Sequence, residues 1–281
     1  MKNIFSVSYG DFVRFDAKPN EDAVLVSKKF PILAVADGVT QSHYENGRYA
    51  LPHGAKMAAQ IFCKSSVKYL EKALAQKNLS PIQIKKIIKE SFDSANDKIK
   101  ALNENHKINE KTMDYVQHDW FDTVGVVAVV ASGVLSYGVV GDCGLVVFDK
   151  HNKKKFQTRD GVHPAVLQFE KKYPDFASFS KDKRALLIHK EFRNNPDGQG
   201  YGSFTGEASV QTYYVLGSKK LTKGDMVVLY SDGLVPLLKN KETIQKIRQG
   251  DAKEFKKYAM GLAKENPGLY GNDRTLARII I

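Results

Sequence analysis

The sequence has little of what stabilises small secreted proteins or anchors a chain in a membrane. Its 281 residues include only two cysteines, Cys63 and Cys143, fewer than a secreted disulfide framework usually has. No run approaches the roughly 18 to 20 apolar residues of a membrane span, and the first residues lack the apolar core of a signal peptide. These absences predict a cytoplasmic protein with no membrane contact.

Several metal-site, nucleophile and nucleic-acid signatures are also missing. The seven histidines show no His-x-x-x-His spacing of the kind that holds zinc. Neither cysteine stands next to a phosphate-cradling Gly/Arg loop, so we interpret both as structural. The glycine-rich stretch 198–202 follows no predicted strand and opens no predicted helix, so it is interpreted as a flexible loop and not as a phosphate loop. No zinc-finger or RNA-binding motif occurs, and we expect no nucleic-acid partner.

What is present is the composition of an ordinary globular protein, 42% hydrophobic and 26% charged. The formal net charge is +12, and half of that excess lies in a short part of the chain. Residues 150–200 contain twelve Lys/Arg and six Asp/Glu, a net charge of +6. We predict one domain over residues 1–281, with a basic, irregular insert or flap at about 150–212 that attracts acidic, phosphorylated segments.

Hydrophobic patterning predicts both strands and helices. Two long helices are predicted at 51–73 and from Pro81 onward, the second with Ser80 as N-cap and Gln83 completing a capping box. Residues 103–119 are predicted to be a loop, and 241–265 to hold two shorter helices. Short apolar runs predict strands at 3–9, 22–36, 123–131, 134–140, 145–148, 213–216, 226–230 and 276–281. This order favours a layered α+β domain over alternating βαβ units.

Acidic residues mark the ends of these predicted strands. Asp37, Asp142 and Asp232 follow three apolar runs, the pair Glu21-Asp22 precedes one, and Asn272-Asp273 leads into the last. Carboxylates at neighbouring strand ends can converge on one point, and their mutual repulsion then favours bound cations. Oxygen ligands favour Mg²⁺ or Mn²⁺ over zinc.

A turn provides the alternative explanation for each acid taken alone. Asp-Gly is a common turn signal, and Asp142-Cys143-Gly144 is also consistent with a simple hairpin between two strands. Asp37-Gly38 and Asp232-Gly233 are poor hairpin candidates, because no predicted strand follows either one closely. Five acidic sites at strand ends therefore favour a shared metal centre.

Four short motifs carry a resemblance to a known family. In order, they are Asn20-Glu21-Asp22-Ala23, Val35-Ala36-Asp37-Gly38, Val139-Val140-Gly141-Asp142 and Tyr230-Ser231-Asp232-Gly233-Leu234. Their order and spacing resemble those of the metal-dependent serine/threonine protein phosphatases of type 2C, in a bacterial-type form, over residues 5–281. The resemblance implies a four-layer αββα sandwich of two antiparallel sheets flanked by helix pairs. It also implies phosphorylated proteins as substrates.

The resemblance also implies a role for each acid. Asp37 would bridge two divalent cations, and the Gly38 carbonyl would bind one of them. Glu21 and Asp22 would support the same ion, directly or through water, and Asp232 would bind the other. Asp142 would help to hold a third, weaker ion. Two such cations can activate a shared water for attack on phosphorus, which makes Asp37 and Asp232 the central catalytic residues.

Three departures from the family pattern bear on substrate and metal binding. The phosphate-binding arginine expected four residues before Glu21 is replaced by Ala17, which leaves Arg14 and Lys18 as candidates for that role. Val39 stands where some members have a histidine.

The third departure lies at the C-terminal motif, where the family pattern is Asp-Asn-x-Thr. This chain has Asn272-Asp273-Arg274-Thr275, so either Asn272 or Asp273 would be the ligand. We favour Asp273, because a carboxylate binds a hard cation more strongly than a neutral amide oxygen does. These departures also keep open the alternative of a weak or inactive pseudophosphatase that acts as a partner-binding module.

Overall fold

The computed structural model describes residues 4–10, 20–39, 53–75, 79–111, 113, 115 and 119–281. Ten strands in this part of the chain form two antiparallel sheets with the orders β1-β10-β9-β6-β7 and β2-β3-β4-β5-β8. The strands are β1 (Ile4–Tyr9), β2 (Ala23–Val26), β3 (Ile32–Gly38), β4 (Thr123–Ala131), β5 (Val134–Val140), β6 (Gly144–Phe148), β7 (Lys154–Gln157), β8 (Val215–Lys220), β9 (Met226–Tyr230) and β10 (Arg274–Ile280). The helices are α1 (Gly54–Leu74), α2 (Pro81–Asn105), α3 (His163–Lys172), α4 (Lys181–Leu187), α5 (Lys241–Gln249), α6 (Ala252–Glu265) and α7 (Pro267–Tyr270).

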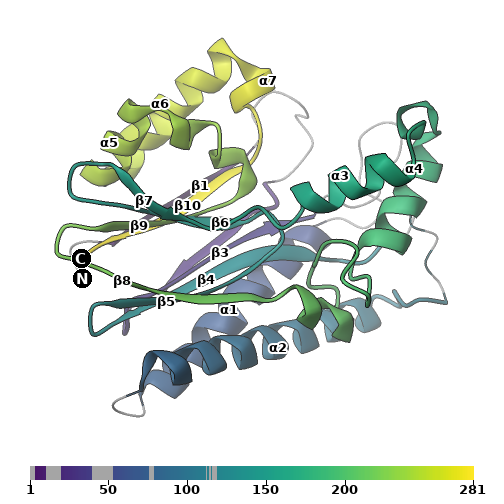
Figure 1. Ribbon diagram of the computed structural model, residues 1–281, viewed down its shortest axis with the longest axis horizontal. Coiled ribbons are helices and arrows are strands. Elements are labelled where there is room, and N and C mark those ends of the chain that lie inside the picture. The colour runs from purple at the N-terminus through teal and green to yellow at the C-terminus, as the bar shows by residue number, and fades with distance from the viewer. Residues whose placement is uncertain are drawn as a thin grey trace.

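The elements stack in four layers, as Figure 1 shows. Helices α1 and α2 cover the outer face of the β2-β3-β4-β5-β8 sheet, and α5 and α6 cover the other sheet. A separate apolar cluster fills the space between the two sheets. The predicted α+β sandwich with flanking helix pairs is confirmed, and α3 and α4 project beyond one end of it (right in Figure 1).

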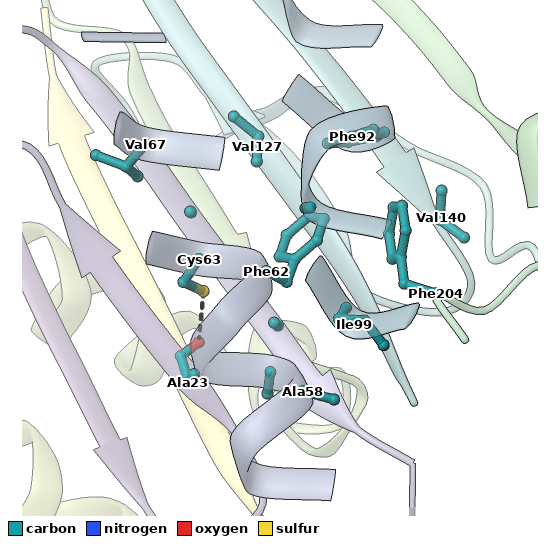
Figure 2. Close-up of a cluster of buried hydrophobic side chains, with 14 of the residues drawn as sticks. Ala23, Ala58, Phe62, Cys63, Val67, Phe92, Ile99, Val127, Val140 and Phe204 are labelled. Atoms are coloured by element: carbon teal, nitrogen blue, oxygen red, sulfur yellow. Dashed lines mark hydrogen bonds between the residues drawn. The ribbon is translucent and has the colours of Figure 1, made fainter. Parts of the chain in front are cut away.

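The largest core cluster joins the long helices to their sheet. Phe62 of α1 and Phe92 of α2 lie with ring centroids 5.4 Å apart, and Phe204 packs against both rings (Figure 2). The predicted capping box of Ser80 and Gln83 starts α2 as expected. Both cysteines of the chain are buried and free.

Strand alternation decides toward which face of its sheet the Asp37 side chain points. In β3, Leu33 and Val35 face the cluster between the sheets, whereas Ala34 and Ala36 face α1. Asp37 continues the row of Leu33 and Val35 at the end of the strand, so its carboxylate points toward the space between the sheets. The packing of the sheets thus brings this acid near those of the opposite sheet.

Several sequence-based predictions are wrong in detail. The segment 150–212 is not irregular, because it contains β7, α3 and α4, whose shortness gives only weak periodicity. The strand predicted at 213–216 is displaced, since β8 begins at Val215 and a 3-10 helix covers Ala208–Tyr213. The two apolar runs within 22–36 form β2 and β3 as predicted, whereas α2 continues to Asn105, into the segment predicted to be a loop.

The turn at Asp142 is not a hairpin. The two strands that it joins lie in different sheets, so the chain crosses from one layer to the other there. A hairpin would have left Asp142 at a solvent-exposed tip, whereas the crossing places it between the sheets.

No helix in the described residues is long and apolar enough to span a bilayer, and the cytoplasmic location stays a prediction.

Candidate metal centre

Four elements deliver the central acids to one end of the sandwich. Asp37 and Gly38 are the last two residues of β3, and Asp142 lies in the crossing between β5 and β6. Asp232 directly follows β9 and opens a short 3-10 helix, Asp232–Leu234. Asp22 immediately precedes β2. Strands β3, β5, β6 and β9 are apolar and mostly buried, so they hold the attached carboxylates with little freedom.

Asp37 stands at the centre of this cluster electrostatically. Burial and the nearby charges of Asp22, Asp232 and Asp142 raise the pKa of its carboxyl well above the ordinary range. Burial also raises the pKa of Asp232, which shares a hydrogen bond with Asp37. Such a pair shares a proton when nothing else neutralises it, and a bound cation would replace that proton.

Asp22 is fully buried and held by Ser231, which directly follows β9 of the other sheet. Ser231 Oγ donates to its Oδ2 at 2.7 Å, and the same hydroxyl oxygen accepts from the backbone N–H of Thr275 at 3.0 Å. In the described structure the other oxygen, Oδ1, is buried with no hydrogen-bond partner. Burial raises the Asp22 pKa to about 7, and the charges of Asp273 and Asp232 add to this effect. The carboxylate therefore has one oxygen fixed and one available as a ligand.

Asp142 belongs to the same electrostatic cluster. The preceding Gly141 has a φ of 78°, a left-handed conformation that lets the chain turn from one sheet to the other. Burial raises the Asp142 pKa to about 7, with further contributions from the charges of Asp232 and Asp160. Asp160 was not predicted from the sequence, and its Oδ1 accepts hydrogen bonds from the backbone N–H groups of Val162 and His163 at the start of α3.

The last two candidate ligands point to different neighbours. Asp273 is buried, and its Oδ2 accepts a hydrogen bond from the backbone N–H of the buried Glu21 at 3.1 Å. Asn272 is exposed, with its Nδ2 3.5 Å from Oδ1 of Asp232. Asn272 thus lies beside Asp232, whereas Asp273 lies beside Glu21. Both side chains border the cluster.

Gly38 allows a close approach that no other residue would. A Cβ at this position would lie 2.6 Å from the carbonyl oxygen of Ala55 and 2.9 Å from that of Glu21. The backbone beside it is fixed by Thr123, whose Oγ1 donates to the Asp37 carbonyl oxygen at 2.5 Å. This packing holds the β3 end against α1.

The donor set fits hard divalent cations bound through few protein ligands. All of the clustered side-chain donors are oxygens, and one of them is the unpartnered Oδ1 of Asp22. No set of three His, Cys, Asp or Glu side chains in the described part of the chain is arranged around a single point. Mg²⁺ is usually held by one or two carboxylates and several waters, so paired acids suffice for such ions.

A family model described as protein phosphatase 2C matches residues 10–266 of the sequence, nearly the whole chain. The chain belongs to the protein phosphatase 2C family. By family it is a serine/threonine protein phosphatase, as its motifs predicted.

Solved structures share this phosphatase fold at low sequence identity. The serine/threonine phosphatase PstP/Ppp of Mycobacterium tuberculosis is 18% identical, with a TM-score of 0.64 over 99% of this chain and 97% of that chain. The PstP catalytic domain with two manganese ions is 17% identical, with a TM-score of 0.62 over the same shares of the two chains. The S. agalactiae serine/threonine phosphatase is 18% identical, with a TM-score of 0.62 over 99% and 98%. A search of curated proteins found no match.

A buried ion cluster links the segment after α4 to the neighbourhood of the acidic cluster. Arg193 Nη2 lies 2.8 Å from Oδ1 of Asp119, and Nη1 lies 3.3 Å from Oδ2 of Asp122. His189, within the π-helix Ile188–Phe192, also contacts Asp119. Burial acts to raise the pKa of Asp119, but Arg193 and His189 hold it well below its ordinary value. Burial and the charge of Asp119 raise the pKa of Asp122 to about 7.

This ion cluster is connected to the backbone of the candidate metal centre. The Asp122 carbonyl oxygen accepts from the N–H of Val39 at 3.2 Å, and the next residue, Thr123, holds the Asp37 carbonyl. The segment interpreted as a flexible loop is instead tightly packed, since a Cβ on Gly200 would lie 1.8 Å from the carbonyl oxygen of Phe192. No local sequence pattern indicates this cluster, because its acids lie about 70 residues before His189 and Arg193.

Two further neighbours of the acids were also missed. Ser231 stands inside the Tyr-Ser-Asp-Gly motif, so its position next to Asp232 was a usable signal. Lys56 of α1 donates from Nζ to the Asp22 carbonyl oxygen, and no local pattern indicates that contact. The proposed phosphate-binding residues Arg14 and Lys18, and Ala17 between them, lie outside the described residues.

Proposed function

We propose that this family member hydrolyses phosphoserine and phosphothreonine on proteins with two divalent cations, Mg²⁺ or Mn²⁺, held by the acidic cluster. The observation that carries the proposal is the convergence of Asp22, Asp37, Asp142 and Asp232 from separate elements, each with a raised carboxyl pKa. Buried like charges are unfavourable unless protons or cations neutralise them. A third, weaker ion beside Asp142 is part of the proposal.

Each residue then has a definite task. Asp37 and Asp232 are the ligands nearest to the reacting groups, while Ser231 orients Asp22 and Thr123 fixes the Asp37 backbone. The Gly38 carbonyl and Glu21 complete the ligand set. When bound, the cations lower the pKa of a shared water and neutralise charge on the phosphoryl oxygens. Val39 cannot transfer a proton, so we assign no side-chain general acid to that position.

Two similarities outside the geometry support the same proposal. The family model matches nearly the whole chain, and a solved phosphatase of the same fold holds two manganese ions. We assign the phosphate-binding role to Arg14 and Lys18, in place of the arginine that the family has at position 17. The alternative, a pseudophosphatase, is motivated by Ala17 and by the exposed amide of Asn272 beside Asp232.

Metal-dependent turnover is the direct test. We expect the purified chain to hydrolyse a phosphothreonine peptide with Mn²⁺ or Mg²⁺, to stop in excess chelator, and to recover when Mn²⁺ is restored, because the paired carboxylates alone provide no activated water. Phosphate release reports the rate. Turnover that persists in excess chelator would contradict the two-metal proposal, and no turnover at any metal concentration would favour the pseudophosphatase.

The C-terminal ligand is decided by a pair of single substitutions. If Asp273 is the ligand, Asp273→Asn should raise the Mn²⁺ concentration needed for half-maximal activity by about tenfold or more, because it removes a charged oxygen donor. Asn272→Ala serves as the matched change at the neighbouring residue and should shift that concentration much less. Titrating Mn²⁺ against both variants separates the candidates. The assignment to Asp273 fails if Asn272→Ala raises the Mn²⁺ concentration needed for half-maximal activity and Asp273→Asn leaves it unchanged.

A further inference from the structure

An apolar pocket of about 320 Å³ lies beside the acidic cluster. Its wall on the sandwich side includes Val39 and Val124, and its opposite wall is formed by Ala165 and Phe169 of α3 with Ile188 of the π-helix. Asp142 borders the same pocket. The pocket is therefore continuous with the metal centre on one side and with the α3–α4 segment on the other.

The far wall of the pocket is a packed structure. The Phe169 ring centroid lies 4.3 Å from that of Phe176 and 4.7 Å from that of Phe192, both in edge-to-face geometry. These three rings also line the pocket. Aromatic pairs of this kind give the segment a small apolar core of its own. The pocket shape is thus held by packed side chains on both sides.

The chemistry of the walls restricts what can enter. Apart from Asp142, the charged residue on the lining is Glu170, so both charges are negative. An acidic group would be repelled there, and a polar one would find few partners. An apolar group would bury its surface and gain contacts that water cannot supply.

We propose that this pocket binds an apolar side chain of the phosphorylated protein substrate, close in sequence to the phosphorylated residue. This inference rests on the proposed function, because Asp142 and Val39 belong both to the pocket and to the surroundings of the metal centre. A peptide whose phosphate lies at the acids passes the pocket opening within a few residues. The occupant is therefore a leucine-like or aromatic residue of the substrate.

The first experiment compares peptides. Each phosphothreonine peptide carries one leucine in an otherwise all-alanine sequence, at one of about four positions on either side of the phosphothreonine. Affinity is measured by anisotropy and kcat/KM by phosphate release, and both are compared with the values for the all-alanine peptide. We expect one position at which leucine improves both quantities by about tenfold or more. Equal values at every position would overturn the proposal.

Two adjacent residues of α3 provide a matched pair of variants. Val166 lines the pocket and is 42% exposed, whereas Leu167 is 53% exposed and is not on its lining. Val166→Asp should remove the leucine preference, and Leu167→Asp should keep it, although both add the same charge to the same helix. Both sites are exposed, so neither change removes a core contact. Identical behaviour of the two variants would refute the pocket as the binding site.

The proposed function and the pocket fail in different ways. A chain without turnover at any Mn²⁺ concentration contradicts the proposed function, and anisotropy still decides whether leucine peptides bind at the pocket. A chain that hydrolyses phosphothreonine peptides with no leucine preference keeps the proposed function and overturns the pocket assignment. The two measurements therefore test the proposed function and the pocket assignment separately.

Discussion

Replacing Asp37 by asparagine should lower phosphatase activity by at least about a thousandfold, and Asp232→Asn should do the same. Asp37 is the acid whose pKa is raised by the charges of Asp22, Asp232 and Asp142, and in the proposed two-metal site it would be a ligand of both ions. Initial rates of phosphate release at saturating Mn²⁺ measure the effect. Asp97→Asn on the exposed face of α2 is the control and should keep wild-type activity.

Asp37→Asn should leave the metal-free protein as stable as the wild type or more stable. The folded-state pKa of Asp22 and of Asp142 is about 7, above the ordinary 3.8. Such groups bind protons more tightly when folded, so their contribution to stability is complete below about pH 4 and is lost as pH rises through about 7. Metal-free wild type should therefore melt at a lower temperature at about pH 8 than at about pH 5.

Asp37→Asn should reduce that pH dependence, because it removes one charge from the repelling set. Thermal melts in chelator at both pH values, for Asp37→Asn and Asp97→Asn, provide the comparison. Wild-type turnover in Asp37→Asn at saturating metal would remove Asp37 from the site. A large loss of metal-free stability would instead show that the acid supports the fold.

Arg193→Met should cost about 3–5 kcal/mol of unfolding free energy, since it leaves buried carboxylates without their cation. Arg193 is 4% exposed, and its guanidinium contacts both Asp119 and Asp122. Denaturant unfolding monitored by circular dichroism measures the loss. The Mn²⁺ requirement should rise as well, because Asp122 holds the backbone of Val39 next to Gly38.

Arg248→Met is the matched control for Arg193→Met. Arg248 also makes several hydrogen bonds, but its partners are the side chain of Asn152 and the backbone carbonyls of Asp149 and Gly224. The nearby buried acid Asp225 keeps its own ion pair with Lys155 at 2.6 Å, so we expect a smaller loss and an unchanged Mn²⁺ requirement. The double variant Arg193→Met/Asp119→Leu should lose less stability than the two single losses added together. Additive losses would argue against a buried ion cluster.

Local signals in the sequence were sufficient to predict that acids lie at the strand ends and to predict much of the fold. Apolar runs located β3, β9 and β10, and the acid at each strand end was visible as a residue that breaks the run. Ser80 and Gln83 marked the start of α2, because a capping box is formed by neighbours in sequence. The motif order identified the family over nearly the whole chain.

Only the tertiary structure decided what depends on distant contacts. A hairpin at Asp142 was left open as an alternative, because a sequence does not show to which sheet a strand belongs. The Arg193 cluster and the pocket between Val39 and α3 join residues far apart in the chain, and periodicity carries no such information. The different surroundings of Asn272 and Asp273 also needed the fold, since adjacent residues entering a strand face opposite sides.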